Sequence, residues 1–345
     1  MYGLLRSLLF TIPAEDAHRL AFLALAPLES EPWVRDRIRG RLPVPASAAV
    51  TRMGLSFPSP IGLAGGFDKN ARRVRALAAL GFGFLEVGTV TAEAQEPNPS
   101  PNLFRLPDDR ALINRLGFPN DGASVVATRY ARSVGRGVAG VPVAFSIGKS
   151  RSVPLEPIDG VVGDYLASFR AVRDVADFVV VNVSSPNTKG LRALQGAELA
   201  RTLLGALVHE GSPVPLLLKI SPDLSEGDLD ALLDVVADVK LDGLVATNTT
   251  LSRAGLTSRS DLVRSIGDGG LSGPPLRPRA LEVVRRARER LGPDATLIGV
   301  GGIETGEHAR AFLDAGANLV QLYTGFIYGG PGAPTRIARE LVALR

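Results

Sequence analysis

The sequence predicts a parallel (β/α)₈ barrel with an N-terminal two-helix extension. From residue 60 onward, short apolar runs alternate with amphipathic stretches of helical length, which is the pattern of βα units in a parallel sheet. Eight such units follow one another, and 345 residues accommodate them, since a barrel of this kind needs about 250 residues and tolerates insertions. We therefore expect an N-terminal segment, residues 1–42, and a barrel domain, residues 43–345.

The eight expected strands are Ile61–Ala64, Phe84–Val87, Val141–Ile147, Asp177–Val183, Pro215–Ile220, Asp242–Thr247, Thr296–Gly301 and Asn318–Tyr323. Runs such as FVVVNV and PLLLKI are nearly all apolar, as in strands covered on both faces. Helical periodicity follows most strands, and Ser225 with Asp228 resembles a helix-capping pair. An open doubly wound sheet is the alternative, but LAGGFDKN lacks the G-x-G-x-x-G spacing of that fold.

Two connections are long, from Thr89 to Gly140 and from Thr249 to Pro275, and loops of this length are usually functional lids or inserts. In the N-terminal segment we expect helices at 3–10 and 14–26, the second ended by Pro27. Their apolar runs are too short to span a bilayer, which takes about 20 residues. The two helices either cap the barrel or lie in a membrane interface beside their arginines.

The composition excludes several chemistries. The chain has no cysteine, which excludes disulfides and thiolate sites. Its three histidines, His18, His209 and His308, are far apart, so no metal site is expected. The charge of +4 and the pI near 9.6 suit an anionic partner, but no basic stripe interleaved with aromatic residues predicts nucleic-acid binding.

Polar side chains gather where the predicted strands end, which is where barrels of this class have their active sites. They are Lys69, Asn70, Thr89, Ser146, Lys149, Asn182, Ser184, Ser185, Asn187, Lys219, Ser221, Thr247, Asn248, Thr249 and Thr250. A carboxamide has a donor beside an acceptor and can pair with a ring of alternating C=O and N–H groups, such as a pyrimidinedione. A single asparagine there would be an ordinary turn residue, but the set that includes Asn114 favours ring binding.

Glycines follow the last two predicted strands, in GVGGIETGEHA and YTGFIYGGPG. Backbone N–H groups in such loops bind phosphate, and barrels often hold phosphate at these two positions. Tight turns also need glycine, but two clusters in successive units indicate a phosphate site. Without a metal or an activated nucleophile, this site predicts a phosphorylated organic cofactor.

Six motifs resemble one family: NRLGF at 114–118, VNVSSPNTKGLR at 181–192, KISPDLS at 219–225, ATNTT at 246–250, GGLSGPPL at 269–276 and IGVGGI at 298–303. In this order they resemble the dihydroorotate dehydrogenases of the membrane-associated, quinone-using class. The resemblance implies FMN-dependent oxidation of (S)-dihydroorotate to orotate, a step of de novo pyrimidine (UMP) biosynthesis. Electrons would pass to a membrane quinone.

The resemblance also implies residue roles. Ser185 would be the catalytic base, which takes a proton from C5 while hydride leaves C6. Substrate would be bound by Lys69, Asn114, Arg115, Leu116, Gly117, Phe118, Asn182, Asn187, Asn248 and Thr249. FMN would be bound by Ala64, Gly65, Gly66, Phe67, Asp68, Thr89, Ser146, Asn182, Lys219, Thr247, Gly273, Gly302, Tyr323 and Thr324.

The quinone would meet His18, Arg105 and Tyr323, and the N-terminal segment would dock on anionic lipid. The resemblance thus implies a peripheral protein on the cytoplasmic face of the cell membrane. The chain departs from the family pattern at Ser146, where many relatives have asparagine, at Gly65 in place of alanine, and at Pro119 in place of asparagine.

Two other functions remain open from the residues. A dihydrouridine synthase, which acts on RNA, would suit the basic pI, but that family has a cysteine acid and this chain has no cysteine. A non-enzymatic phosphate-binding scaffold would need no ordered set of lysine, asparagine and serine at the strand ends.

Overall fold

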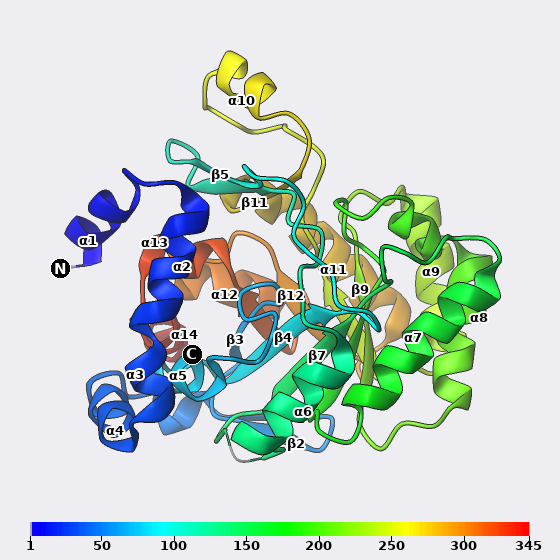
Figure 1. Cartoon of the computed structure of the whole chain (residues 1–345), viewed down its shortest axis with the longest axis horizontal. Helices are drawn as coiled ribbons and strands as arrows, with labels where there is room; N and C mark the ends of the chain where they lie inside the picture. The colour runs from blue at the N-terminus through cyan, green and yellow to red at the C-terminus, as the bar shows by residue number, and fades with distance from the viewer. Residues whose placement is uncertain (1, 138, 345) are drawn as a thin grey trace.

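The computed structural model describes residues 2–137 and 139–344. Eight parallel strands form a closed barrel in chain order (Figure 1). They are β3 (Ile61–Leu63), β4 (Phe84–Val90), β7 (Val143–Ile147), β8 (Phe178–Asn182), β9 (Leu216–Ile220), β10 (Gly243–Ala246), β12 (Thr296–Val300) and β13 (Leu319–Leu322). The last strand pairs with the first, with Val320 opposite Ile61. The prediction of eight strands and a barrel is confirmed, and the open-sheet alternative is wrong.

Helices cover the outside of the barrel (Figure 1). They are α5 (Val74–Ala79), α6 (Ala123–Ser133), α7 (Ile158–Val172), α8 (Ala197–His209), α9 (Glu226–Asp238), α11 (Arg277–Leu291), α12 (Gly306–Asp314), α13 (Thr324–Gly329) and α14 (Ala333–Ala343). In α9 the Ser225 side chain accepts a hydrogen bond from the Asp228 N–H, which confirms the predicted cap. The same helix buries Leu229, Leu232 and Val236 against the barrel.

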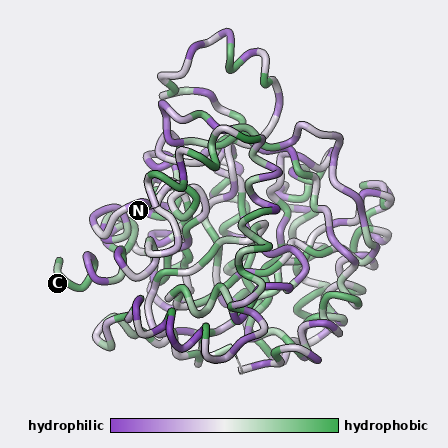
Figure 2. The backbone as a smooth tube through the Cα atoms, turned by 60° about the vertical axis from the view of Figure 1, so that its left-hand side comes forward, coloured by the Kyte–Doolittle hydropathy of each residue, from purple (hydrophilic) through white to green (hydrophobic). Residues whose placement is uncertain are grey.

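The interior of the barrel is closed at one end only. A separate apolar cluster inside the barrel includes Phe57, Phe84, Phe178 and Ile298. Phe57 comes from a hairpin, β1 (Val50–Arg52) and β2 (Leu55–Phe57), which precedes the first barrel strand. Figure 2 shows the hydrophobic segments running through the middle of the fold. Because apolar side chains fill the amino-terminal end of the barrel, a site can form only at the carboxyl end.

The two long connections fold together over that carboxyl end. The first contains β5 (Leu103–Leu106) and β6 (Ala111–Asn114), and the second contains α10 (Ser260–Ile266), which projects from the top of Figure 1, and β11 (Gly270–Ser272). These three strands form an antiparallel sheet in the order β11-β6-β5. Neither connection is a structureless loop, so each is an insert with its own hydrogen bonds.

The N-terminal segment has four helices, not the two expected: α1 (Tyr2–Leu9), α2 (Ala14–Ala24), α3 (Ala26–Ser30) and α4 (Pro32–Arg41). Pro27 lies in the first turn of α3, where proline is favoured because its missing N–H needs no partner, so it begins a helix instead of ending one. Leu28 and Ile38 pack against the barrel core. Within residues 2–137 and 139–344, no helix is long and apolar enough to cross a membrane. The domain division at residue 42 stays a prediction.

Candidate active site

One cavity opens at the carboxyl end of the barrel, and it gathers most of the predicted site residues. The predicted residues in its wall are Ala64, Gly65, Gly66, Lys69, Thr89, Asn114, Leu116, Gly117, Phe118, Asn182, Ser185, Asn187, Lys219, Thr247, Asn248, Thr249, Gly273, Gly302, Tyr323 and Thr324. They come from the ends of different strands and from both inserts. Barrel closure therefore brings together residues that lie up to 260 positions apart in the chain, from Ala64 to Thr324.

Four predicted contact residues do not line this cavity. Asp68 is buried and accepts hydrogen bonds from the backbone N–H groups of Arg72 and Arg73, so it shapes the turn after β3. Phe67 faces a second, apolar cavity.

The other two residues outside the lining are Arg115 and Ser146. The Arg115 guanidinium donates to the Ile266 carbonyl over 2.6 Å and stacks on Phe104, which ties the two inserts together. The Ser146 hydroxyl lies 2.9 Å from the Thr89 hydroxyl, behind the wall. Ser146 therefore bonds to Thr89, which lines the cavity, and is not itself in the lining.

A chain of polar side chains connects the ends of β4, β8 and β10. The Asn182 amide donates to the Thr89 hydroxyl over 2.9 Å, and the Ser184 hydroxyl donates to Asn182 Oδ1 over 3.0 Å. The Asn248 amide in turn donates to the Ser184 hydroxyl over 2.9 Å. Hydrogen bonds of this kind fix the amide orientations, so the cavity presents donors and acceptors in set positions.

Ser185 and two asparagines, Asn187 and Asn114, line another part of the cavity. The Ser185 oxygen accepts a hydrogen bond from the Asn187 backbone N–H over 3.2 Å. The Asn187 amide donates to Asn114 Oδ1 over 3.1 Å, across from the end of β6. Ser185 lines the cavity and is 5% exposed, so it meets little bulk solvent.

Two of the strand-end lysines behave differently. Lys69 lines the cavity and donates to the Gly66 carbonyl over 2.7 Å. Burial lowers the pKa of Lys69 to about 8, and the neighbouring Asp68 carboxylate only partly opposes this. Lys149 does not reach the cavity, because its ammonium donates to the Ser150 and Val153 carbonyls. The strand-end position of a lysine is therefore not enough to place it in the site.

Lys219 has a buried partner that the sequence analysis missed. Its ammonium lies 2.9 Å from Glu86 Oε1, and the other Glu86 oxygen accepts from the Gln321 amide over 2.8 Å. Gln321 Oε1 is buried and has no hydrogen-bond partner among the described residues, and Gln321 lines the cavity. The available signal was a polar residue inside an apolar strand, in FLEVG and in NLVQLY.

Gly65 is explained by the same carboxylate. A Cβ added at Gly65 would lie 2.4 Å from Glu86 Oε1, which is too close for a non-bonded contact. Gly65, where the family pattern has alanine, therefore leaves room for the Glu86 side chain in its present position.

The glycine-rich loops after β12 and β13 form the opposite wall. A Cβ at Gly325 would lie 2.0 Å from the Ile303 carbonyl oxygen, and one at Gly302 would lie 2.6 Å from the Gly273 carbonyl oxygen. Gly302 also has a φ of 64°, in the left-handed region that favours glycine. These loops bring bare backbone close to the cavity, as a phosphate cradle requires. Gly301 and Gly325, both in the predicted phosphate loops, also line the cavity, as does Ile303.

A second cavity is apolar and lies between the N-terminal helices and the barrel. Its wall includes Leu5, Leu9, Ala17 and Leu20 from α1 and α2 and also contains the three predicted quinone contacts, His18, Arg105 and Tyr323. Leu103, Leu112 and Tyr323 also line the first cavity, so the two cavities share three wall residues.

No group of histidine, cysteine, aspartate and glutamate that could hold a metal ion occurs within the described ranges 2–137 and 139–344.

Comparisons with known proteins agree with the resemblance seen in the sequence. A model of the family described as dihydroorotate dehydrogenase matches residues 47–344. A protein of Thermobifida fusca named dihydroorotate dehydrogenase (quinone) is 49% identical, covering 98% of this chain and 90% of its own. One of Nocardioides with the same name is 54% identical, covering 88% and 89%.

A solved structure agrees as well. The Eimeria tenella dihydroorotate dehydrogenase crystallised with ferulenol has a TM-score of 0.83 and 33% identity, over 96% of this chain and 91% of that one. The family match covers the whole barrel, which sets aside the RNA-modifying and scaffold alternatives. The chain is therefore an oxidoreductase of the dihydroorotate dehydrogenase family and groups with its quinone-using class.

Proposed function

We propose that this protein oxidises (S)-dihydroorotate to orotate in pyrimidine biosynthesis and passes the electrons to a membrane quinone. The observation that supports this most strongly is the single cavity in which Ser185, the asparagine set and Lys69 face the glycine-rich loops. Its amides suit a ring of alternating C=O and N–H groups, and its lysine suits a carboxylate.

The first cavity suits FMN. The glycine-rich loops offer backbone N–H groups to the phosphate, and Gln321 Oε1, buried without a partner among the described residues, is available to an N–H donor of the flavin ring. Lys219 supplies a positive charge in the same wall. FMN, when bound, accepts the hydride that leaves C6 of the substrate.

The substrate-binding residues have separate tasks. Asn114, Asn187 and Asn248 read the ring edges, and Lys69 neutralises the carboxylate. The Ser185 hydroxyl first loses its own proton to solvent. Its oxygen then takes the proton from C5, so that the C5–C6 double bond forms as the C6 hydride departs. Because Asn187 N–H donates to this oxygen over 3.2 Å, the hydroxyl is held in one orientation beside the ring-binding amides.

The experiment that tests the reaction is anaerobic mixing with dihydroorotate. The purified protein should be yellow, and dihydroorotate should bleach the flavin absorbance in a single turnover. A short-chain quinone should then restore the colour. A colourless protein, or a yellow one that dihydroorotate does not bleach, would contradict the proposal.

The pH dependence of orotate binding tests the role of Lys69. Since burial lowers the pKa of this lysine to about 8, the ammonium is charged below that pH and neutral above it. Orotate affinity should be full below pH 8 and should fall above it by about tenfold per pH unit, measured by titrating the flavin spectrum with orotate. Lys69→Met should bind orotate weakly with a much smaller slope. Equal slopes in both proteins would contradict the assignment.

The second cavity suits a quinone head group. Burial, with a smaller effect of the charge on Lys69, lowers the pKa of His18 to about 3, so the imidazole is neutral and can donate a hydrogen bond to a carbonyl without charge. The Arg105 guanidinium donates to the Ile12 carbonyl over 2.7 Å and lies 4.6 Å from the centre of the Phe10 ring. Tyr323, shared with the first cavity, connects this site to the flavin.

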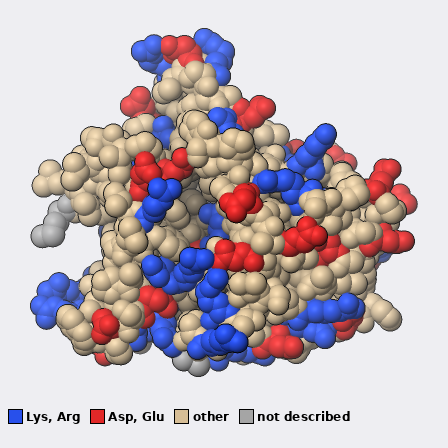
Figure 3. Space-filling model, in the orientation of Figure 1, with Lys and Arg blue, Asp and Glu red and all other residues tan. Residues whose placement is uncertain are grey.

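The surface around α1 supports docking on a membrane. Leu4 is 82% exposed and Leu8 is 67% exposed, and the corner formed by α1 in Figure 3 consists almost entirely of uncharged residues. Tyr2 and Arg6 donate to the carbonyls of Ile327 and Tyr328, which holds α1 against the barrel. An apolar surface of this kind can lie in the lipid interface without crossing the bilayer.

Replacing Leu4 and Leu8 together with serine should therefore weaken the membrane contact alone. We expect weaker flotation with vesicles that contain anionic phospholipid and slower reoxidation by a long-tailed quinone in those vesicles. Bleaching by dihydroorotate should be unchanged. The control is Val208→Ser, an exposed apolar residue on α8. Undiminished flotation of the double variant would show that α1 only covers the barrel.

A further inference from the structure

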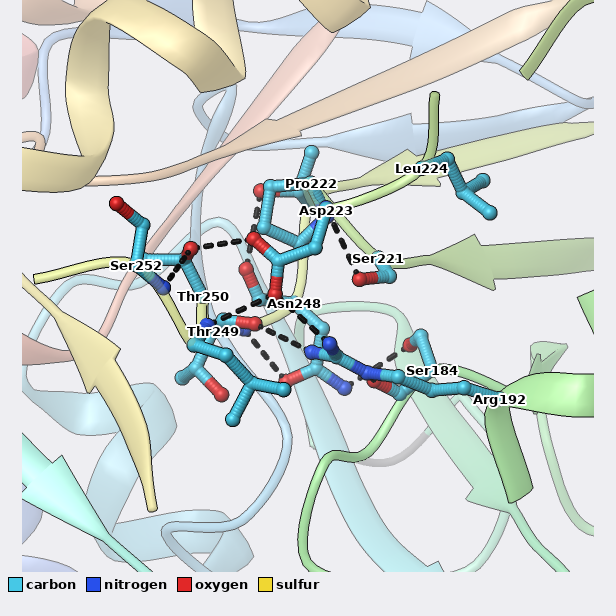
Figure 4. A network of polar contacts seen from close by, with 12 residues as sticks. Ser184, Arg192, Ser221, Pro222, Asp223, Leu224, Asn248, Thr249, Thr250 and Ser252 are labelled. Atoms are coloured by element: carbon cyan, nitrogen blue, oxygen red, sulfur yellow. Dashed lines mark hydrogen bonds and ion pairs between the residues drawn. The ribbon is translucent and has the colours of Figure 1, made fainter. Parts of the chain in front are cut away.

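Arg192 joins three loops at the mouth of the barrel. It lies in η2 (Leu191–Gln195), directly after the loop that carries Ser185. Its Nε donates to the Ser184 carbonyl over 3.1 Å, one terminal nitrogen lies 2.7 Å from Asp223 Oδ2, and the other donates to the Thr249 carbonyl over 3.0 Å. Figure 4 shows the guanidinium between these groups. One side chain thus connects the loops that follow β8, β9 and β10.

Asp223 completes the connection from the other side. Its Oδ2 accepts the Leu251 backbone N–H over 2.8 Å, and its Oδ1 accepts the Thr250 hydroxyl. The Asp223 backbone N–H donates to the Ser221 hydroxyl over 3.1 Å, so the backbone at Asp223 is itself held close to the end of β9. The loop after β10 is therefore attached both to Arg192 and to its partner.

The peptide groups that Arg192 holds lie next to the reacting groups. Ser184 precedes Ser185, the proposed base, and Thr249 follows Asn248, one of the ring-binding amides. The Asn248 amide also donates to the Ser184 hydroxyl over 2.9 Å, across the same junction. Neither Arg192 nor Asp223 is among the residues that line the cavity. Their contacts therefore hold the loops that carry Ser185 and Asn248 without reaching into the cavity.

We propose that Arg192 and Asp223 are positioning residues that align Ser185 with C5 of the bound ring, an inference that rests on the proposed function. The side chains are 20% and 24% exposed. An ordinary surface ion pair contributes little to stability and has no reason to alter a rate. This pair differs because two of its hydrogen bonds end on backbone carbonyls beside the reacting groups, and a misplacement of about 1 Å can cost about 10²-fold in rate.

The test is stopped-flow reduction of the flavin by dihydroorotate without oxygen. Arg192→Ala should lower the limiting rate constant by about 10²-fold at full flavin content. Asp223→Asn, which keeps the shape of the side chain, should give a smaller loss. Arg192→Lys keeps the charge but not the planar fork, so its rate should lie between those of the alanine variant and the wild type. The double variant Arg192→Ala/Asp223→Asn should be no slower than Arg192→Ala, because the two residues act as a unit.

The matched control is Arg201→Ala. Arg201 also makes a 2.7 Å ion pair, with Asp238, but it joins α8 to α9 on the surface and should leave the rate unchanged. Substrate deuterated at C5 separates alignment from general damage: misplacing the base should enlarge the isotope effect on reduction, whereas lost stability or flavin should not.

Two results distinguish failure of this inference from failure of the proposed function. Suppose that dihydroorotate bleaches the wild type. If Arg192→Ala and Asp223→Asn are then reduced as fast as the wild type, or more slowly but with the same isotope effect, the positioning role is wrong and the proposed reaction stands. If dihydroorotate does not bleach the wild type, the proposed function itself fails.

Discussion

Ser185→Ala should slow anaerobic reduction of the flavin by dihydroorotate by about 10²–10⁴-fold, the range for a positioned acid–base group. The variant removes the oxygen that we propose takes the C5 proton, and it leaves the backbone of the loop in place. Flavin content and orotate affinity should stay close to those of the wild type, because Lys69, Lys219 and the asparagines are unchanged. The measurement is a single-turnover trace of flavin absorbance.

Ser184→Ala is the matched control for this experiment. The Ser184 hydroxyl is buried one residue away and bonds to Asn182 and Asn248, but it does not line the cavity. Its loss should cost much less in rate than the loss of Ser185. Equal rates for Ser185→Ala and the wild type would exclude Ser185 as the base, and equal slowing by both variants would indicate a structural effect on the loop.

The pH profile gives a second view of Ser185. A hydroxyl must lose its proton to act as a base, so reduction of the wild type should quicken as the pH rises. Ser185→Cys should shift this dependence toward lower pH, since a thiol ionises near pH ~8.5. An identical profile for both proteins would mean that another group controls the proton transfer.

Lys219→Met should destabilise the protein by about 3–5 kcal/mol, because removal of one partner of a buried ion pair leaves the other charge uncompensated. The Glu86 side chain has no exposed surface and the Lys219 side chain is 6% exposed. Without the ammonium, the Glu86 carboxylate keeps only the Gln321 amide as a side-chain donor among the described residues. The free energy of unfolding in urea, measured after removal of flavin so that ligand binding does not contribute, gives the loss.

The double variant Lys219→Met/Glu86→Gln should recover most of that stability, since no unpaired buried charge remains. It should still bind FMN more weakly than the wild type, because the positive charge in the cavity wall is gone. The exposed ion pair of Arg201 with Asp238 is the control. Arg201→Met should change the free energy of unfolding by about 1 kcal/mol or less. If the double variant were as unstable as Lys219→Met, the loss would reflect packing and not charge.

The sequence by itself determined the barrel and the side on which the cavity lies. Apolar runs such as FVVVNV and the cap at Ser225 depend on neighbours within a few positions, so a linear sequence contains them in full. The position of each strand end also depends on nearby residues. The polar residues that follow the strand ends, among them Ser185, Asn187 and Asn248, could therefore be assigned to one cavity from the sequence. The count of N-terminal helices was wrong because Pro27 can end one helix or begin the next, and packing of α3 against α5 decided which.

Only the tertiary structure decided which polar groups meet. Glu86 and Lys219 are 133 positions apart, and they pair because closure of the barrel turns alternate side chains of β4 and β9 toward the same interior. Lys149 also follows a strand end, but its ammonium donates to nearby carbonyls and does not reach the cavity. Arg192 joins three loops through contacts with residues 8, 31 and 57 positions away. The pattern within one strand or loop does not contain such distances, because they depend on how separate strands align across the closed sheet.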